Sequence, residues 1–95
     1  MGQKKAVHAI ISGRVQGVNF RMATEMAADK YGVYGWVRNR RDGTVEAVFE
    51  GDAEAVDQIL KWCQRGPSLA NVTNIETTEE PFSGQYTDFS VRYTY

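Results

Sequence analysis

In some stretches of this chain every second residue is apolar, which predicts a strand. In others an apolar residue recurs every three to four positions, which predicts a helix. Strands are predicted at five places, namely residues 6–12, 34–40, 44–50, 71–79 and 88–95. The third of these alternates most clearly, with Val45, Ala47 and Phe49 on one face. Asp42-Gly43 lies between the second and third strands, and this dipeptide is a strong signal for a tight hairpin.

Two stretches have the spacing of helices. The first covers residues 20–31, where Asn19 suits the N-cap position and Gly32 ends the helix. Its apolar face consists of Phe20, Ala23, Ala27 and Tyr31. The second runs from a cap at Asp52 through Arg65, and Gly66-Pro67 ends it. Its apolar face consists of Val56, Ile59, Leu60 and Cys63.

The order of these elements predicts a fold class. The order β-α-β-β-α-β is typical of an α+β, ferredoxin-like sandwich. This chain adds one extra strand at its C-terminal end. In that fold two helices cover one face of an antiparallel sheet. The first two strands run in the same direction with the third between them, so their C-terminal ends lie at one edge. We expect residues 1–95 to form a single domain with one core.

Composition and charge narrow the class of protein. The formal net charge is −1, so no overall basic field favours nucleic acid as a partner. The apolar runs are too short to cross a bilayer and residues 1–5 lack a signal-peptide core, so we expect a cytoplasmic protein with no membrane partner. One cysteine, Cys63, excludes an intrachain disulfide, and one histidine beside it gives no basis for a transition-metal site. We expect a monomer that uses no cofactor.

The segment 13–21, Gly-Arg-Val-Gln-Gly-Val-Asn-Phe-Arg, gives the strongest indication of chemistry. It places a glycine-containing loop before a helix, where backbone N–H groups turn toward a common point at the positive end of the helix dipole. Arg21 adds a positive charge in the first turn, where the dipole alone disfavours it. We therefore predict a phosphate site between Arg21 and this loop. The alternative is an ion pair from Arg21 to Glu25, worth at most ~0.5 kcal/mol.

Two motifs give the chain a resemblance to a known family. Gly13-Arg14-Val15-Gln16-Gly17-Val18 with Phe20-Arg21, and Gly35-Trp36-Val37-Arg38-Asn39 after one helix, resemble the motifs of the acylphosphatase family. The resemblance extends over the whole chain, including the Asp-Gly hairpin and the aromatic C-terminal strand. It implies metal-independent hydrolysis of a carboxylic–phosphoric mixed anhydride to a carboxylate and inorganic phosphate. The implied partners are a small-molecule acyl phosphate and inorganic phosphate.

The resemblance also implies a role for individual residues. Arg21 corresponds to the family's phosphate-binding arginine, and Asn39 corresponds to the asparagine that orients the attacking water. The phosphate cradle corresponds to the backbone N–H groups of Val15, Gln16, Gly17, Val18, Asn19 and Phe20. Arg14 is expected to have a supporting role at best.

Two other functions compete with hydrolysis. The first is RNA binding on the open face of the sheet, where bases could stack on Tyr34, Trp36, Tyr93 and Tyr95. The slightly negative charge and the absence of an RNP1 pattern weigh against it. The second is a sensor domain that binds a phosphorylated metabolite without turnover, which would use the same loop but would not need Asn39.

Overall fold

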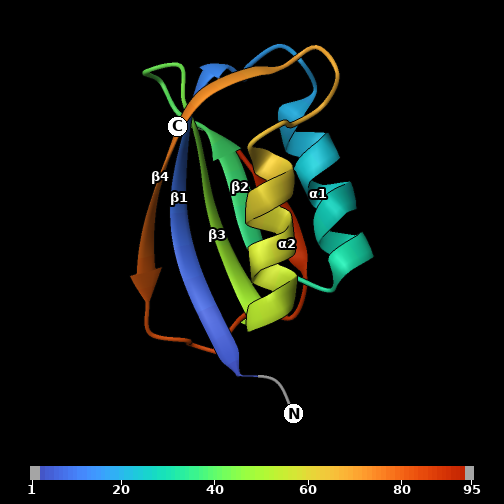
Figure 1. Cartoon of the computed structure of the whole chain (residues 1–95), viewed down its shortest axis with the longest axis vertical. Helices are drawn as coiled ribbons and strands as arrows, with labels where there is room; N and C mark the ends of the chain where they lie inside the picture. Colours follow the sequence, from blue (N-terminus) through green and yellow to red (C-terminus); the bar gives the residue numbers. More distant parts are fainter. Residues whose placement is uncertain (1–2, 94–95) are drawn as a thin grey trace.

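The computed structural model describes residues 3–93 and has the element order β1–α1–β2–β3–α2–β4–β5 (Figure 1). The strands are β1 (Lys4–Arg14), β2 (Tyr34–Asn39), β3 (Val45–Asp52), β4 (Asn71–Glu80) and β5 (Phe89–Arg92). The helices are α1 (Phe20–Tyr31) and α2 (Ala53–Cys63). All seven predicted elements are therefore present, although the predicted end of the last strand, residues 94–95, lies outside the described residues.

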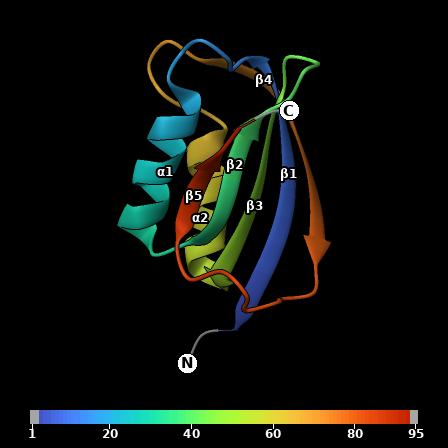
Figure 2. The same cartoon turned by 180° about the vertical axis from the view of Figure 1, so that it is seen from behind.

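The sheet has the strand order β4-β1-β3-β2-β5. β3 pairs antiparallel with both β1 and β2, and β1 pairs antiparallel with β4, as the ferredoxin-like arrangement requires. The extra strand departs from the expected antiparallel sheet, because β5 pairs parallel with β2. After β4 the segment 81–88 runs along one end of the sheet to its other edge, so β5 starts at the same end as β2 (Figure 2). The complete sheet is therefore mixed.

Both helices cover one face of the sheet, and the core lies between these two layers (Figures 1 and 2). The alternation predicted for β3 is confirmed, since Val45, Ala47 and Phe49 are fully buried. On α1 the buried residues are Phe20, Thr24, Ala27 and Ala28, and on α2 they are Val56, Ile59 and Cys63. This single apolar layer removes both helix faces from water, which is the main stabilising contribution to such a fold.

The helix termini differ in detail from the sequence prediction. Asn19 and Asp52 occupy the N-cap positions, but neither side chain forms a capping hydrogen bond. The Asp52 carboxylate instead accepts a hydrogen bond from Lys4 Nζ at 2.6 Å. α2 ends at Cys63, two residues before the predicted end at Arg65. Its last turn tightens, because the Arg65 N–H donates to the Trp62 carbonyl three residues back.

The second face of the sheet is not an open polar surface, because the segment 81–88 covers part of it. Glu50, on the outward-facing side of β3, is only 4% exposed. Its carboxylate accepts hydrogen bonds from Ser83 N, Ser83 Oγ and Gly84 N at 3.1, 2.7 and 3.1 Å. On β2, Trp36 Nε1 donates to the Tyr86 hydroxyl at 3.2 Å. These contacts hold the chain between β4 and β5 against the sheet.

A second polar group on this face centres on Glu46. Partial burial acts to raise the pKa of the Glu46 carboxyl, but hydrogen bonds with His8 and Arg38 outweigh burial and hold that pKa below its ordinary value. Both contacts, to His8 Nε2 and to Arg38 Nε, are 2.7 Å long. The ionised Glu46 carboxylate therefore stabilises the folded state at pH values above the ordinary glutamate pKa. This contribution is lost as the pH falls through the lowered pKa of Glu46. His8 is thus a structural residue of the sheet.

Glu50→Gln is expected to lower the free energy of unfolding by about 1–3 kcal/mol at pH 7. The amide offers one acceptor oxygen in place of two, so at least one of the three donors in Ser83 and Gly84 loses its partner. Urea denaturation measures the effect. Glu76→Gln, on the exposed surface of β4, is the matched control and should be neutral. Equal stability of the two variants would mean that the Glu50 contacts add nothing to stability.

Candidate active site

The glycine loop and the end of β2 meet at one edge of the sheet. There, between the loop, the start of α1 and the end of β2, lies a small hollow of about 100 Å³. It is lined by Val15, Gly17, Asn19, Phe20, Arg21, Met22 and Asn39. Arg21 and Asn39 are 18 positions apart in the sequence and border the same space. They meet because β1 and β2 run in the same direction on either side of β3, so both end at this edge (Figure 1).

The path of the loop begins with a bulge at the end of β1. The pairing of β1 with β4 shifts register between Ser12 and Gly13. Gly13 has a φ of 118°, and a Cβ at this position would collide with the carbonyl oxygen of Asn71. Only glycine therefore allows β4 to approach so closely here. The bulge turns the chain out of the sheet and starts the loop.

Asn19 has a left-handed backbone conformation, with φ 67° and ψ 27°. Among the described residues it is the one non-glycine with a positive φ. This conformation costs about 1 kcal/mol or more for a residue with a Cβ, and such strain concentrates at functional sites. Two residues earlier, Gly17 has a φ of 74°. The loop therefore contains two residues with positive φ, Gly17 and Asn19, just before α1.

Gln16 fixes the loop to the turn that follows β2. Its side-chain Nε2 donates both of its hydrogens, to the carbonyl oxygens of Arg40 at 2.7 Å and Thr44 at 2.9 Å. Gln16 and Val18 do not line the hollow. The Gln16 side chain is directed to the turn and the Val18 side chain is buried in the core. The sequence analysis missed this anchoring role, because a glutamine gives no signal of its partner before the turn is placed.

The two candidate catalytic side chains differ in their surroundings. Arg21 is partly exposed, and within residues 3–93 no carboxylate forms an ion pair with it, so the alternative pairing with Glu25 is not formed. The Oδ1 atom of Asn39 is shielded from solvent, and the residue is held at the end of β2. Met22 also borders the hollow, although sequence reasoning did not single it out. Its position directly after Arg21 was the available signal.

Other groups considered from the sequence belong to the scaffold. Burial raises the pKa of the Cys63 thiol to about 12, which confirms a core cysteine. Within the described residues no group of three or more His, Cys, Asp or Glu side chains could hold a metal ion. No helix in the described part of the chain is long and apolar enough to cross a membrane.

Of the aromatic residues considered for stacking RNA bases, Tyr34 and Tyr93 are exposed by 45% and 73%, whereas Trp36 is covered. Trp36 is 9% exposed, and two guanidinium groups lie near its ring. The Cζ atoms of Arg38 and Arg92 are 5.5 and 4.8 Å from the ring centroid. This ring is already covered, so it cannot stack a base in the observed conformation. Tyr95, the last of the four aromatic residues considered, lies outside the described residues.

Comparison with known sequences and with solved structures points to one protein family. A sequence model of the acylphosphatase family matches residues 7–91. An acylphosphatase of Rubrobacter xylanophilus is 54% identical over 90 residues, covering 95% of this chain and 82% of that protein. One from a Synechococcus species is 52% identical over 94 residues, covering 99% of each chain. The crystal structure of acylphosphatase from Bacillus subtilis matches with a TM-score of 0.90 at 38% identity, covering 94% of this chain and 99% of that one. The chain therefore belongs to the acylphosphatase family.

Proposed function

We propose that this chain hydrolyses acyl phosphates, the mixed anhydrides of a carboxylic acid and phosphoric acid, to a carboxylate and inorganic phosphate. The observation that carries the proposal is the hollow in which Arg21 and Asn39 lie beside the glycine loop of a member of the acylphosphatase family. Its volume of about 100 Å³ is roughly three times the volume of one water molecule in the liquid. That size suits a phosphoryl group with a water beside it.

The phosphoryl group is held by Arg21 and by the loop backbone. The guanidinium offers a planar fork of donors that matches two phosphate oxygens. Within the described residues, no protein carbonyl accepts a hydrogen bond from the loop amides of residues 16–19, so these donors are available to an anion. The left-handed positions at Gly17 and Asn19 are typical of backbone that aims successive N–H groups at one point. The N-terminus of α1 adds its dipole.

Asn39 positions the attacking water. Its carboxamide is neutral, so it orients the water by hydrogen bonding and does not remove a proton from it. The water oxygen forms a bond to phosphorus while the bond from phosphorus to the acyl oxygen breaks, and the carboxylate leaves with that electron pair. Because a carboxylate is a weak base, it needs no proton to leave. The proton of the water passes to a phosphoryl oxygen.

The proposal needs no metal ion, because the protein itself supplies the charge. Phosphoryl transfer mainly requires that the reactants are positioned and that the equatorial oxygens are stabilised. Arg21 and the loop amides meet both requirements. We also propose that the protein acts as a monomer in the cytoplasm, where its single cysteine, a buried free thiol, stays reduced.

Release of inorganic phosphate from an acyl phosphate tests this function directly. With benzoyl phosphate as substrate, the purified protein is expected to release phosphate far above the uncatalysed rate, and excess EDTA should leave that rate unchanged. A protein that binds phosphate without turnover would instead be a sensor domain. Loss of the rate with EDTA, restored by a divalent cation, would show that a metal takes part.

Arg21→Ala is expected to lower kcat/KM by about 10²–10³-fold and to weaken inhibition by inorganic phosphate. The variant loses the fork of donors that holds the phosphoryl group in both the bound and the reacting state. Arg41→Ala, an exposed arginine in the hairpin turn, is the matched control and should keep the parent values. Full activity of Arg21→Ala would remove the guanidinium from the mechanism.

Asn39→Ala is expected to lower kcat by about 10²-fold or more, with a much smaller change in inhibition by phosphate. The variant keeps the phosphate cradle and loses only the group that orients the water. Steady-state kinetics measure both quantities, with Asn74→Ala on the exposed face of β4 as the control. An unchanged kcat would show that Asn39 does not position the water.

A further inference from the structure

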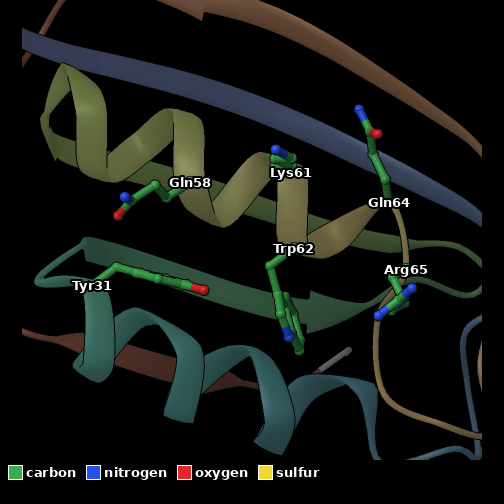
Figure 3. A pocket seen from close by; sticks show the side chains of 6 residues that line it. All are labelled: Tyr31, Gln58, Lys61, Trp62, Gln64 and Arg65. Carbon is green, nitrogen blue, oxygen red and sulfur yellow. The ribbon is translucent and has the colours of Figure 1, made fainter.

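Two adjoining hollows lie between α1 and α2, well outside the small hollow that holds Arg21. The first has a volume of about 580 Å³ and is lined by Tyr31, Gln58, Lys61, Trp62, Gln64 and Arg65 (Figure 3). The second has a volume of about 470 Å³ and shares Tyr31 and Trp62 with the first, so we treat them as one interhelical groove. We propose that this groove binds a planar aromatic ring that carries a phosphate group, the chemistry of a nucleoside monophosphate.

Two aromatic rings form the apolar part of the groove. Tyr31 and Trp62 are both half-buried and pack against the core, and Figure 3 shows both in the space between the helices. The Trp62 ring packs against the ring of Phe20, with ring centroids 5.8 Å apart and an interplanar angle of 54°. Both residues are thus packed against the core and also line the groove. Such fixed rings favour stacking of a planar ligand, because little side-chain entropy is lost on binding.

The charges around the groove are of one sign. Lys61, Arg65 and Lys30 line it, whereas none of the chain's 12 acidic residues does, although the net charge of the chain is −1. Lysines near the C-termini of both helices are favoured by the helix dipoles, so the cations alone do not define a site. Beside two half-buried rings, however, the same cations give the groove complementarity to a ring with an attached anion.

Two amide side chains complete the lining. Gln58 and Gln64 lie along and just after α2, and each offers both donors and an acceptor (Figure 3). A heteroaromatic ring has donors and acceptors on its edge that such amides can pair with. A plain hydrocarbon ring has none. The lining therefore favours a base over a simple phenyl group, and the volume of about 580 Å³ is within the range of small-molecule sites.

The groove is independent of the proposed hydrolysis. It shares no lining residue with the hollow around Arg21. Binding can therefore be measured in the Arg21→Ala protein, in which the phosphate site is weakened, and no readout of activity is needed.

Titration of the Arg21→Ala protein with AMP tests the proposal, using calorimetry and tryptophan emission. AMP is expected to bind at least about tenfold more tightly than adenosine or inorganic phosphate, because only AMP engages both the rings and the cations. Binding should quench the emission of Trp62, and Trp62→Phe should abolish the quench while keeping a ring against Phe20. The affinity should fall as salt is added.

Charge variants locate the phosphate of the ligand. Lys61→Gln together with Arg65→Gln is expected to weaken AMP binding about fivefold or more, whereas Lys4→Gln, an exposed lysine on β1, should leave it unchanged. Thermal melting confirms that each variant is folded. Equal binding of adenosine and AMP would overturn the proposal, as would equal binding of phosphate and AMP. The same holds if the double variant binds AMP as the parent does, or if no binding is detected.

Discussion

The antiparallel pairing of β3 with both β1 and β2 is the constraint on which the candidate site depends. Because β3 lies between them, β1 and β2 run in the same direction and end at the same edge of the sheet. The loop after β1 and the residue that ends β2 are thereby brought together. Arg21 and Asn39 border one hollow for this reason, although 18 positions separate them in the sequence. The proximity of the two candidate catalytic residues therefore follows from the shared direction of β1 and β2.

Strand direction brings the two segments to one edge, and local contacts then fix their distance. The bulge at Gly13 releases the chain from the sheet at a defined residue. The two hydrogen bonds of Gln16 tie the loop to the turn directly after Asn39. A loop held at both ends retains its backbone shape without a ligand, so less entropy is lost when an anion binds. At the other end of the loop, the Asn19 carbonyl accepts a hydrogen bond from Ala23 N at 3.1 Å, which joins this strained residue to α1.

The far face of the sheet shows how this small chain uses its C-terminal segment. Two polar residues of β3 that face away from the helices have protein partners, since Glu50 binds the segment 81–88 and Glu46 pairs with His8 and Arg38. The Glu50 contacts hold the segment that leads to β5, which adds in parallel to the free edge of β2. Trp36 on the same face is buried, and the guanidinium groups of Arg38 and Arg92 lie near its ring. Trp36 is therefore not available to stack a base in the way that RNA-binding modules of this fold use their aromatic residues.

The sequence alone predicted the order of helices and strands, the ferredoxin-like fold and a site around Arg21, and its resemblance to a known family added Asn39. Those depend on short-range signals: the alternation in β3, the Asp42-Gly43 turn, and the spacing of Gly13, Gly17 and Arg21. Tertiary structure alone decided the partners of the polar side chains. The parallel direction of β5, the burial of Glu50, the anchoring by Gln16 and the grouping of Tyr31 with Trp62 each join residues far apart in the chain. Such contacts depend on where the backbone runs in space, and a one-dimensional pattern of polar and apolar residues does not contain that information.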